Sequence, residues 1–318
     1  MCAVESKLSR LVKAAKMYYQ LDYSQQKIAN ELQISRPSVS RLLHEAKEQG
    51  IVEIHINDPA SGVQKLAQLI KSRFKVKDCI VVNVPMFEDA VIKEYLGKQA
   101  STYLRDLVKE GDIIGTTWGT TLYEIARHMQ PKNVPYVKVV QMNGGISHSE
   151  TNTYASEIVN FLGKAFDTPP HFLPLPAVVD HLVVKQAIVA DRHIKRVLDL
   201  GKEANIAVFT VGDPHEESTI IKADYFSEDD LQILREKRAV GDICSRFFDI
   251  EGRICSEEIN ARTIGIELFD LSKKETTILV AGGQKKISGI LGALNGNYAN
   301  VLITDQFTAE ALLEMQPM

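Results

Sequence analysis

The chain has 318 residues, of which 45% are hydrophobic, so it is long enough for more than one domain and for a sizeable buried core. Its formal net charge of −4 argues against a polycation that coats nucleic acid, and its four cysteines include no Cys-x-x-Cys pair of the kind that binds zinc. The first residues lack the apolar segment of a secretory signal, and no run approaches the ~18 apolar residues of a membrane span, so we expect a soluble, cytoplasmic protein.

Charge is distributed unevenly along the chain. Residues 1–57 carry eight basic and six acidic side chains, a net charge of +2, and the rest of the chain carries −6. A mildly basic segment in front of an acidic one is typical of a DNA-binding domain attached to a soluble domain, although a difference this small also arises by chance.

The first part of the chain predicts a small helical domain. Apolar residues recur at helical spacing over residues 8–19, and two shorter helices are predicted over residues 24–32 and 35–49. Alternating apolar residues then predict a strand, or wing, over residues 51–56. Residues 57–62 have the composition of a linker, so we place the domain boundary between residues 1–57 and residues 58–318.

The two short helices have the pattern of a helix-turn-helix. Ser35 is a good N-cap and Pro37 fits the first turn, so the start of the second helix is well defined. In such motifs the first turns of the second helix meet base edges, and phosphates are contacted from the start of the preceding helix. The predicted DNA-binding residues are Gln25, Gln26, Lys27, Arg36, Ser38, Ser40 and Arg41. The alternative is an ordinary helical pair with a solvated face, and it is favoured by Gln33 at the turn, where many such motifs have glycine.

The remainder of the chain predicts an α/β domain with a mostly parallel sheet, because strands alternate with helix-length segments. Strands are predicted over residues 79–84, 113–117, 137–142, 206–211, 243–248, 278–281 and 301–304, and helices over residues 63–74, 89–109 and from Thr120. Ligands of such sheets bind beyond the carboxyl ends of the strands. The apolar stripe of the first of these helices either contacts another copy of the chain or packs on its own domain.

Several segments at predicted strand ends carry candidate ligand-binding residues. Residues 117–121 lie between a strand and a helix, where hydroxyls and free N–H groups suit an oxyanion, and they match neither the Walker pattern nor the dinucleotide pattern. Lys285 can supply a positive charge to a phosphate, and Asp213 and Asp242 can accept hydrogen bonds from sugar hydroxyls. The candidate effector-binding residues are Thr117, Trp118, Gly119, Thr120, Thr121, Gln141, Asn143, Gly144, Asp213, Asp242 and Lys285. The alternatives are a tight strand-to-helix turn for residues 117–121 and a turn or cap role for Asn143, Asp213 and Asp242.

Several motifs together resemble the SorC family of bacterial sugar-responsive transcriptional regulators. They are the helix-turn-helix at residues 24–43 and the segments at residues 118–121, 144–149, 241–248 and 281–283. The resemblance covers nearly the whole chain and is greatest to members that respond to deoxyribonucleosides. It implies an effector domain related to sugar-phosphate isomerases, a dimer or tetramer on operator DNA, and repression of a catabolic operon that is relieved by a phosphorylated sugar such as deoxyribose 5-phosphate.

The same resemblance implies roles for the candidate residues. Residues 117–121 and Lys285 would hold the phosphate, and the sugar would be surrounded by Gln141, Asn143, Asp213 and Asp242. The chain departs from the pattern at Asn143, where those members have lysine. A lysine amine can form an imine with an open-chain aldehyde, whereas a carboxamide cannot, so we expect noncovalent binding.

A sugar-phosphate isomerase or hydrolase with an appended N-terminal domain is the alternative, because the effector fold is shared with such enzymes. Residues 24–43 favour the regulator, since an isomerase has no need of them, and the candidate residues include no convincing pair of acid and base. We therefore expect no catalytic residues, no metal site and no cofactor. The expected partners are operator DNA, a phosphorylated sugar and further copies of the chain.

Overall fold

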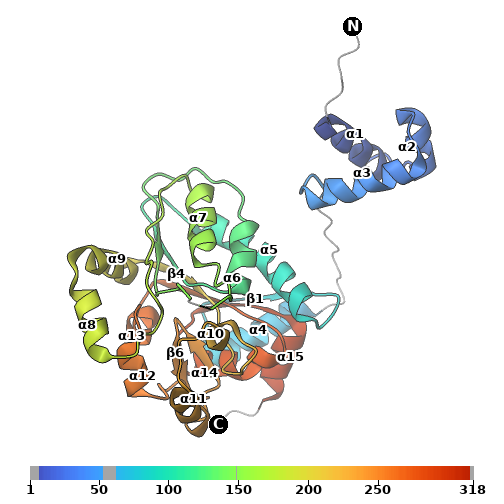
Figure 1. Ribbon diagram of the computed structural model, residues 1–318. Helices are drawn as coiled ribbons and strands as arrows, with labels where there is room; N and C mark the ends of the chain where they lie inside the picture. The colour runs from blue at the N-terminus through green and yellow to red at the C-terminus, as the bar shows by residue number, and fades with distance from the viewer. Residues whose placement is uncertain (1–6, 53–61, 148, 316–318) are drawn as a thin grey trace. The chain divides into compact units, whose positions relative to one another are not determined.

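The computed structural model describes residues 7–52, 62–147 and 149–315 (Figure 1). These residues form two compact units, one within residues 1–60 and the other within residues 61–318. The strand predicted at residues 51–56 and the linker predicted at residues 57–62 lie mostly outside the described residues. Of that strand, Ile51 and Val52 are described, and they pack against the cluster that contains Leu11.

Helices α1 (Lys7–Tyr19), α2 (Gln25–Leu32) and α3 (Arg36–Glu48) make up the smaller unit as far as it is described. Ile28 and Ala29 of α2 are buried in one cluster with Val39 of α3 and Ala14 of α1. The small side chain of Ala29 lets the two short helices approach each other closely. This packing leaves the opposite faces of α2 and α3 in water.

Two serine caps fix where α2 and α3 begin. The hydroxyl of Ser24 accepts the N–H of Lys27, and that of Ser35 accepts the N–H of Ser38, at 3.2 and 3.3 Å. Such caps stabilise a helix by ~1 kcal/mol each. Gln33 ends α2 with a φ of 52°, in the left-handed region that favours glycine. The turn of the motif therefore forms here without its usual glycine.

Six parallel strands form the sheet of the larger unit, in the order β1-β8-β7-β4-β2-β3. They are β1 (Asp78–Val82), β2 (Ile113–Thr116), β3 (Lys138–Gln141), β4 (Ile206–Phe209), β7 (Thr276–Val280) and β8 (Val301–Asp305). Ile278 and Val280 of β7 pack into one apolar core, and Leu279 between them packs into another. A strand that is apolar on both faces is typical of a buried parallel sheet, and the predicted α/β fold is confirmed.

Helices cover both faces of this sheet (Figure 1). The helices of this unit are α4 (Val63–Phe74), α5 (Asp89–Leu107), α6 (Thr120–Arg127), α7 (Ala155–Ala165), α8 (Leu182–Ala190), α9 (Arg192–Glu203), α10 (Thr219–Lys222), α11 (Glu228–Glu236), α12 (Glu257–Arg262), α13 (Leu268–Ser272), α14 (Ile287–Asn295) and α15 (Gln306–Glu314). Ile92 of α5 and Ile158 of α7 belong to one core, whereas Ile290 of α14 and Leu312 of α15 belong to the other. Within the described parts of the chain, no helix is both long enough and apolar enough to cross a bilayer.

The apolar stripe of α4 is covered by its own unit. Ile70 is fully buried, and Val63, Leu66 and Phe74 pack against the core that β1 and α15 share. Of the two interpretations of this stripe, packing on its own domain is therefore the one found. Leu69, on the other side of the helix, remains 45% exposed.

The strand predicted at residues 243–248 is wrong, because this segment is an antiparallel hairpin of β5 (Gly241–Ile243) and β6 (Arg246–Phe248) outside the main sheet. The chain reverses at Cys244 and Ser245, whose φ angles are 55° and 66°. Two-residue turns with positive φ usually contain glycine or asparagine, so the composition gave no sign of this one. The carboxylate of Asp242 holds the turn by accepting the N–H of Ser245 at 3.0 Å.

A fully buried guanidinium fastens this hairpin to the segment at residues 260–267. Arg246 donates to the carbonyls of Ile266, Asn260 and Gly265, at 2.7, 3.0 and 3.2 Å, and to the carboxylate of Glu267 at 2.8 Å. Its side chain is 0% exposed. A buried charge is tolerated only when such partners replace water, so this set of bonds fixes the local arrangement.

We expect Arg246→Ala to lower the free energy of unfolding of the larger unit by ~3–5 kcal/mol, because it leaves the carbonyls of Asn260, Gly265 and Ile266 without this donor, at ~1–3 kcal/mol for each unsatisfied buried group. The chain has a single tryptophan, Trp118, in this unit, so urea unfolding followed by its fluorescence measures the effect. The control is Arg253→Ala, which removes an ion pair to Asp249 from a side chain that is 72% exposed, and its expected cost is much smaller because solvent screens the pair. Equal losses in the two variants would contradict the role given to Arg246.

Candidate functional site

A pocket of about 410 Å³ lies at the carboxyl ends of the strands. In the sheet, β2 lies between β3 and β4, so the chain passes to one side of β2 and then returns to the other. Such a switch in direction opens a crevice at the strand ends, which is where ligands of α/β sheets bind. The pocket is lined by the segments that follow β1, β2, β4 and β7, and by the turn of the β5–β6 hairpin.

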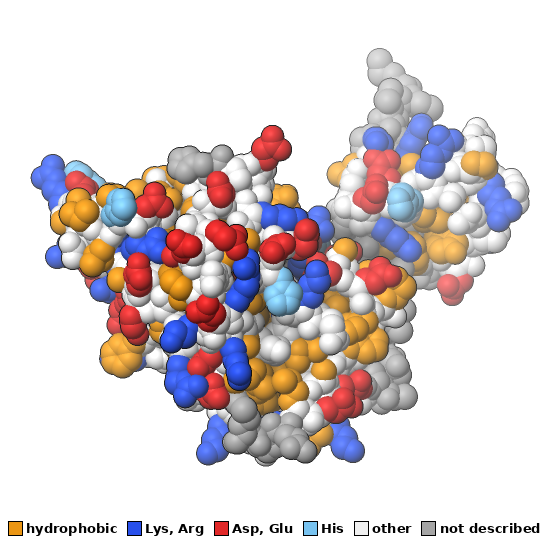
Figure 2. All heavy atoms as spheres, turned by 60° about the horizontal axis from the view of Figure 1, so that its bottom comes forward, with side chains coloured by type: hydrophobic (Ala, Val, Ile, Leu, Met, Phe, Trp, Pro, Cys, Tyr) orange, Lys and Arg blue, Asp and Glu red, His pale blue; other side chains and the backbone are white. Residues whose placement is uncertain are grey.

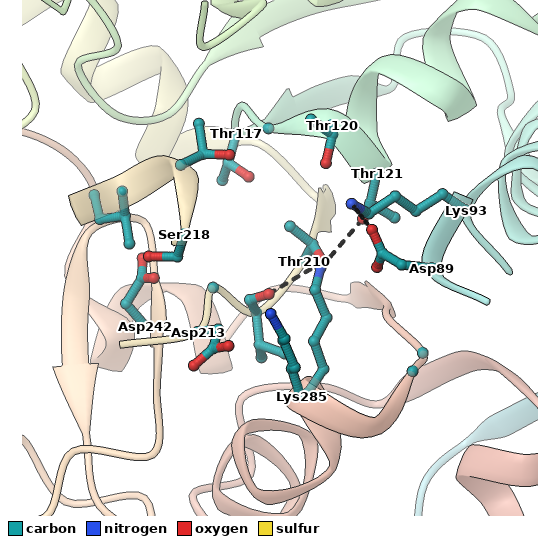
Figure 3. Close-up of a pocket in the computed structure, with 18 of the residues that line it drawn as sticks. Asp89, Lys93, Thr117, Thr120, Thr121, Thr210, Asp213, Ser218, Asp242 and Lys285 are labelled. Carbon is teal, nitrogen blue, oxygen red and sulfur yellow. Dashed lines mark hydrogen bonds and ion pairs between the residues drawn. The ribbon is translucent and has the colours of Figure 1, made fainter. Parts of the chain in front are cut away.

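Lys286 supplies a positive charge deep in this pocket. Its Nζ atom donates to the hydroxyls of Thr121 and Thr210, both at 3.2 Å (Figure 3). Burial, with the nearby charge of Lys93, lowers the pKa of Lys286 to about 8. Because the Thr121 oxygen accepts from the amine, its hydroxyl proton is available to a ligand, whereas the hydroxyl of Thr210 donates to the carbonyl of Val211 at 3.4 Å. A ligand with negative charge would therefore meet an ammonium and the O–H donor of Thr121 together.

The start of α6 adds to this positive end of the pocket. Gly119 caps the helix with a φ of 125°, and Thr120 and Thr121 form its first turn beside the pocket. The free N–H groups and the dipole of a helix N-terminus favour a bound anion. Lys285 also lines this end, and its exposed side chain points into the pocket in Figure 3.

Three polar atoms of the pocket lining are buried and have no hydrogen-bond partner: Oδ1 of Asn143, Oδ1 of Asp242 and Oγ of Ser218. Figure 3 shows Ser218 and Asp242 on the side of the pocket away from Lys93. Burial raises the pKa of Asp242 to about 7, although the N–H of Ser245 opposes the shift. Unpartnered buried groups cost free energy, so this side of the pocket favours a ligand rich in hydroxyls.

Most of the predicted effector-binding residues line this pocket. They are Thr117, Trp118, Gly119, Thr120, Thr121, Asn143, Asp213, Asp242 and Lys285. Figure 3 shows Thr120 and Thr121 on the side of Lys93, Asp242 on the opposite side, and Asp213 beside Lys285. Whether they contact a ligand stays a prediction.

Gln141 and Gly144 do not line this pocket. Both ends of the Gln141 amide are engaged, since it donates to the carbonyl of Asn143 at 2.8 Å and accepts the N–H of Leu173 at 3.2 Å. Gly144 lies where a Cβ atom would be 2.1 Å from the carbonyl oxygen of Pro176, and its own carbonyl accepts the indole N–H of Trp118 at 2.6 Å. In this structure both residues shape the backbone around the pocket.

The sequence analysis missed several residues that line the pocket. The most important are Asp89, Lys93, Thr210, Ser218, Ser245 and Lys286. Lys286 was adjacent to the predicted Lys285, and Thr210 lies directly after β4, so strand ends carried some signal for both. Lys93 had no such signal, because it lies one turn inside α5, where it pairs with Asp89 at 2.5 Å.

The predicted DNA-binding residues lie on the first turns of α2 and α3. Gln26, Lys27, Arg36, Ser40 and Arg41 are exposed, and Gln25 and Ser38 are half-buried. The hydroxyl of Ser38 lies 2.8 Å from that of Ser35, so it takes part in the helix cap. The ammonium of Lys27 lies 3.5 Å from the centre of the Tyr23 ring, which holds its side chain near the start of α2.

Two family models match the chain. A sugar-binding domain matches residues 58–314, and a Crp-like helix-turn-helix domain matches residues 6–61. The deoxyribonucleoside regulator of Bacillus subtilis (strain 168) is 51% identical over 302 residues, which cover 95% of this chain and 96% of that protein. The sorbitol operon regulator of Klebsiella pneumoniae is 31% identical over 96% of this chain and 97% of its own length.

Solved structures agree with these matches. The crystal structure of the full-length sorbitol operon regulator SorC from Klebsiella pneumoniae has a TM-score of 0.74 at 29% identity, over 96% of this chain and 98% of that chain. A transcriptional regulator from Streptococcus pneumoniae TIGR4 has a TM-score of 0.75 at 28% identity, over 81% of this chain and 98% of that one.

The raised pKa of Asp242 predicts a pH-dependent stability. Its carboxyl keeps a proton in the folded state up to about pH 7, whereas the ordinary value is 3.8, so its contribution to the free energy of unfolding falls as pH rises between these values. Asp242→Asn has no carboxyl at this position and therefore does not lose this stabilisation. The melting temperature of the variant minus that of the wild type, measured without ligand, should therefore increase as the pH rises from 4 to 7.

Asp249→Asn is the matched control, because its effect has the opposite sign. Burial raises the pKa of Asp249, but hydrogen bonds from Arg253 outweigh burial, so that the pKa is lowered from its ordinary value. That carboxylate therefore stabilises the fold above its unfolded pKa, and its replacement should cost more at neutral than at acid pH. Parallel pH profiles for the wild type and Asp242→Asn would contradict the assignment.

Proposed function

Because the chain belongs to the SorC family of sugar-binding transcriptional regulators, we propose that it represses a deoxyribonucleoside or sugar catabolic operon and is released by a phosphorylated sugar. The family consists of transcriptional regulators, so the alternative of an isomerase or hydrolase is set aside. In the proposal residues 1–57 bind DNA and residues 58–318 bind the effector. The proposal includes a cytoplasmic location, because that is where a regulator of bacterial genes meets its DNA.

The separation of charge within the pocket carries the effector assignment. Lys286, the threonine hydroxyls and the start of α6 lie at one end, and unpartnered acceptors lie at the other. A phosphate ester of a sugar has the same polarity, with a dianion at one end and hydroxyls at the other. Deoxyribose 5-phosphate is the effector we propose, since the 51% identical relative is named for deoxyribonucleosides.

We assign the phosphate to the positive end of the pocket. Its oxygens would accept from Lys286, from the hydroxyls of Thr120 and Thr121, and from N–H groups at the start of α6. A bound dianion also returns Lys286 towards its charged state, because it offsets the burial that lowers the pKa. The exposed Lys285 adds long-range attraction at the entrance.

The sugar would occupy the opposite end. Oδ1 of Asn143 and Oδ1 of Asp242 each lack a donor, and sugar hydroxyls can supply one to each. Position 143 offers a carboxamide and no amine, so binding there is noncovalent and reversible. Gln141, with both ends of its amide engaged by the backbone, acts by holding the segment that contains Asn143.

DNA binding is assigned to α2 and α3. Arg36 and Arg41 are exposed on the first turns of α3, where a recognition helix meets base edges. A net charge of only +2 over residues 1–57 supplies little nonspecific attraction, so several copies acting together are expected at the operator. The proposal therefore includes a dimer or tetramer.

The phosphate assignment predicts that Lys286→Met binds deoxyribose 5-phosphate ~10- to 150-fold more weakly than the wild type, corresponding to ~1.5–3 kcal/mol for hydrogen bonds to a charged group. Calorimetric titration measures this. Affinity of the wild type should also fall as pH rises through about 8, because the amine loses its proton. Lys285→Met is the control, and its smaller loss follows from solvent screening of an exposed charge. Equal affinity of the wild type for deoxyribose and its 5-phosphate would rule out the assignment.

The DNA assignment predicts that Arg41→Ala weakens specific binding by ~1–3 kcal/mol, the range for a lost base contact. Fluorescence anisotropy with a duplex selected from random DNA, and with a scrambled duplex, separates specific from nonspecific binding. Lys47→Ala is the control, because Lys47 is exposed in the last turn of α3, away from the reading positions. An Arg41→Ala protein that still discriminates the two duplexes as the wild type does would refute this prediction.

A further inference from the structure

Ser218 has the backbone conformation of a helix cap but does not cap its helix. It precedes α10 with φ and ψ of −76° and 151°, nearly the same as the −75° and 150° of Ser35. Ser35 accepts the N–H of Ser38, and Ser227 accepts that of Asp230 at 3.2 Å. Within the described residues, the Oγ atom of Ser218 has no such donor and is buried at the pocket. Its hydroxyl is therefore left for a ligand.

The segment that carries Ser218 is held in place from its other end. The carbonyl of Lys222, the last residue of α10, accepts from the hydroxyls of Ser149 and Thr151 at 2.7 and 3.2 Å. Ile220, in the middle of α10, is buried in the apolar core. Because the backbone around Ser218 is already ordered, a ligand that bonds its hydroxyl pays little additional conformational entropy.

Asp242 supplies a second unpartnered group on the same side of the pocket. Its Oδ2 atom accepts the N–H of Ser245 at 3.0 Å, whereas its Oδ1 atom is buried and has no partner in the described chain. A Cβ atom at Gly212 would be 1.9 Å from Oδ1, so the backbone closes one side of this oxygen. Figure 3 shows Ser218 and Asp242 on the side of the pocket away from Lys93. A partner for Oδ1 has to come from the pocket.

A ligand hydroxyl satisfies both groups at once, because it can donate one hydrogen bond and accept another. It donates to Oδ1 when the carboxyl of Asp242 is charged, and it then accepts from the hydroxyl of Ser218. When the carboxyl carries a proton, the two bonds run in the opposite direction. An ether oxygen or a C–H group cannot make both bonds, so this side of the pocket selects a free hydroxyl.

The chemistry of the proposed effector indicates which hydroxyl this is. With the phosphate of deoxyribose 5-phosphate at the positive end of the pocket, the ring atoms farthest from it are C1 and C2. C2 carries no hydroxyl, so the far end of the closed ring presents the hydroxyl of C1. A nucleotide has no hydroxyl at C1, because this carbon is bonded to a nitrogen of the base.

We propose that Ser218 and Asp242 together bind the C1 hydroxyl of the effector, so that the pocket accepts a free sugar 5-phosphate and rejects the corresponding nucleotide. The inference rests on the effector in the proposed function and adds the residues that recognise its reducing end. Sites that bond a ligand hydroxyl discriminate strongly against analogues without it, because the buried partners are then left unpaired. A regulator of this kind detects a sugar phosphate only after its base has been removed.

The first test changes the ligand and leaves the protein as it is. The probes are deoxyribose 5-phosphate and 1,2-dideoxyribose 5-phosphate, which has hydrogen in place of the C1 hydroxyl. In calorimetric titration the wild type should bind the analogue roughly 10- to 100-fold more weakly, because Ser218 and Asp242 are left without a partner. Equal affinity for the two probes overturns this inference and leaves the proposed effector intact. A wild type that binds neither probe refutes the proposed effector and this inference with it.

The second test assigns the contact to Ser218. Ser218→Ala should bind deoxyribose 5-phosphate roughly 3- to 10-fold more weakly than the wild type, as expected for one lost neutral hydrogen bond. It should bind the dideoxy analogue as the wild type does, because that ligand never makes the bond. A variant that loses affinity for both probes by the same factor, or for neither, overturns the role of Ser218.

The melting temperature without ligand separates ligand binding from a structural role. Ser218→Ala should not lower it, because the hydroxyl has no partner to lose in the empty pocket. Ser227→Ala is the matched control: it removes a serine that does cap its helix, so it should lower the melting temperature by roughly 2–4 °C and bind deoxyribose 5-phosphate as the wild type does. Equal falls in the two variants would show that Ser218 caps α10, and would overturn the inference.

Discussion

The buried guanidinium of Arg246 organises the part of the molecule on which the pocket depends. It holds the segment at residues 260–267, and that segment is bonded on both of its sides. Towards the pocket, Ile264 accepts the N–H of Gly144, and towards α8 it donates to the carbonyl of Ala177. Each bond of the buried guanidinium is costly to break, so the segment at residues 260–267 is held in place. This segment therefore links the Asn143 end of the pocket to the chain that leads into α8.

Charge burial gives the empty pocket its chemical character. The pKa of Lys286 is lowered to about 8 and that of Asp242 is raised to about 7, in both cases chiefly because burial disfavours the charged form. The protein does not fully offset the cost of burying either group, and Oδ1 of Asp242 has no hydrogen-bond partner. A ligand that brings an anion to one and hydroxyl donors to the other relieves both costs together, which favours ligand binding over the empty state.

Local sequence determined the helix-turn-helix and the sheet. Ser24 and Ser35 cap their helices through bonds to residues three positions later, so the caps are visible in a short window of sequence. Strands alternate with helix-length segments, which predicted the parallel sheet, and the strand ends located the loop at residues 117–121 and the segment that contains Lys285.

Tertiary structure alone decided the rest. The bonds of Lys286 join residues 165 and 76 positions apart, so nothing near Lys286 in the sequence distinguishes it from Lys285. The hairpin turn at Cys244 and Ser245 contains no turn-forming glycine, and it places Asp242 at the pocket rather than ahead of a sheet strand. Likewise α4 and α8 both carry apolar residues, but one is covered by α15 and the other is left exposed. Sequence periodicity determines which face of a helix is apolar, whereas burial depends on which distant segments fold against that face.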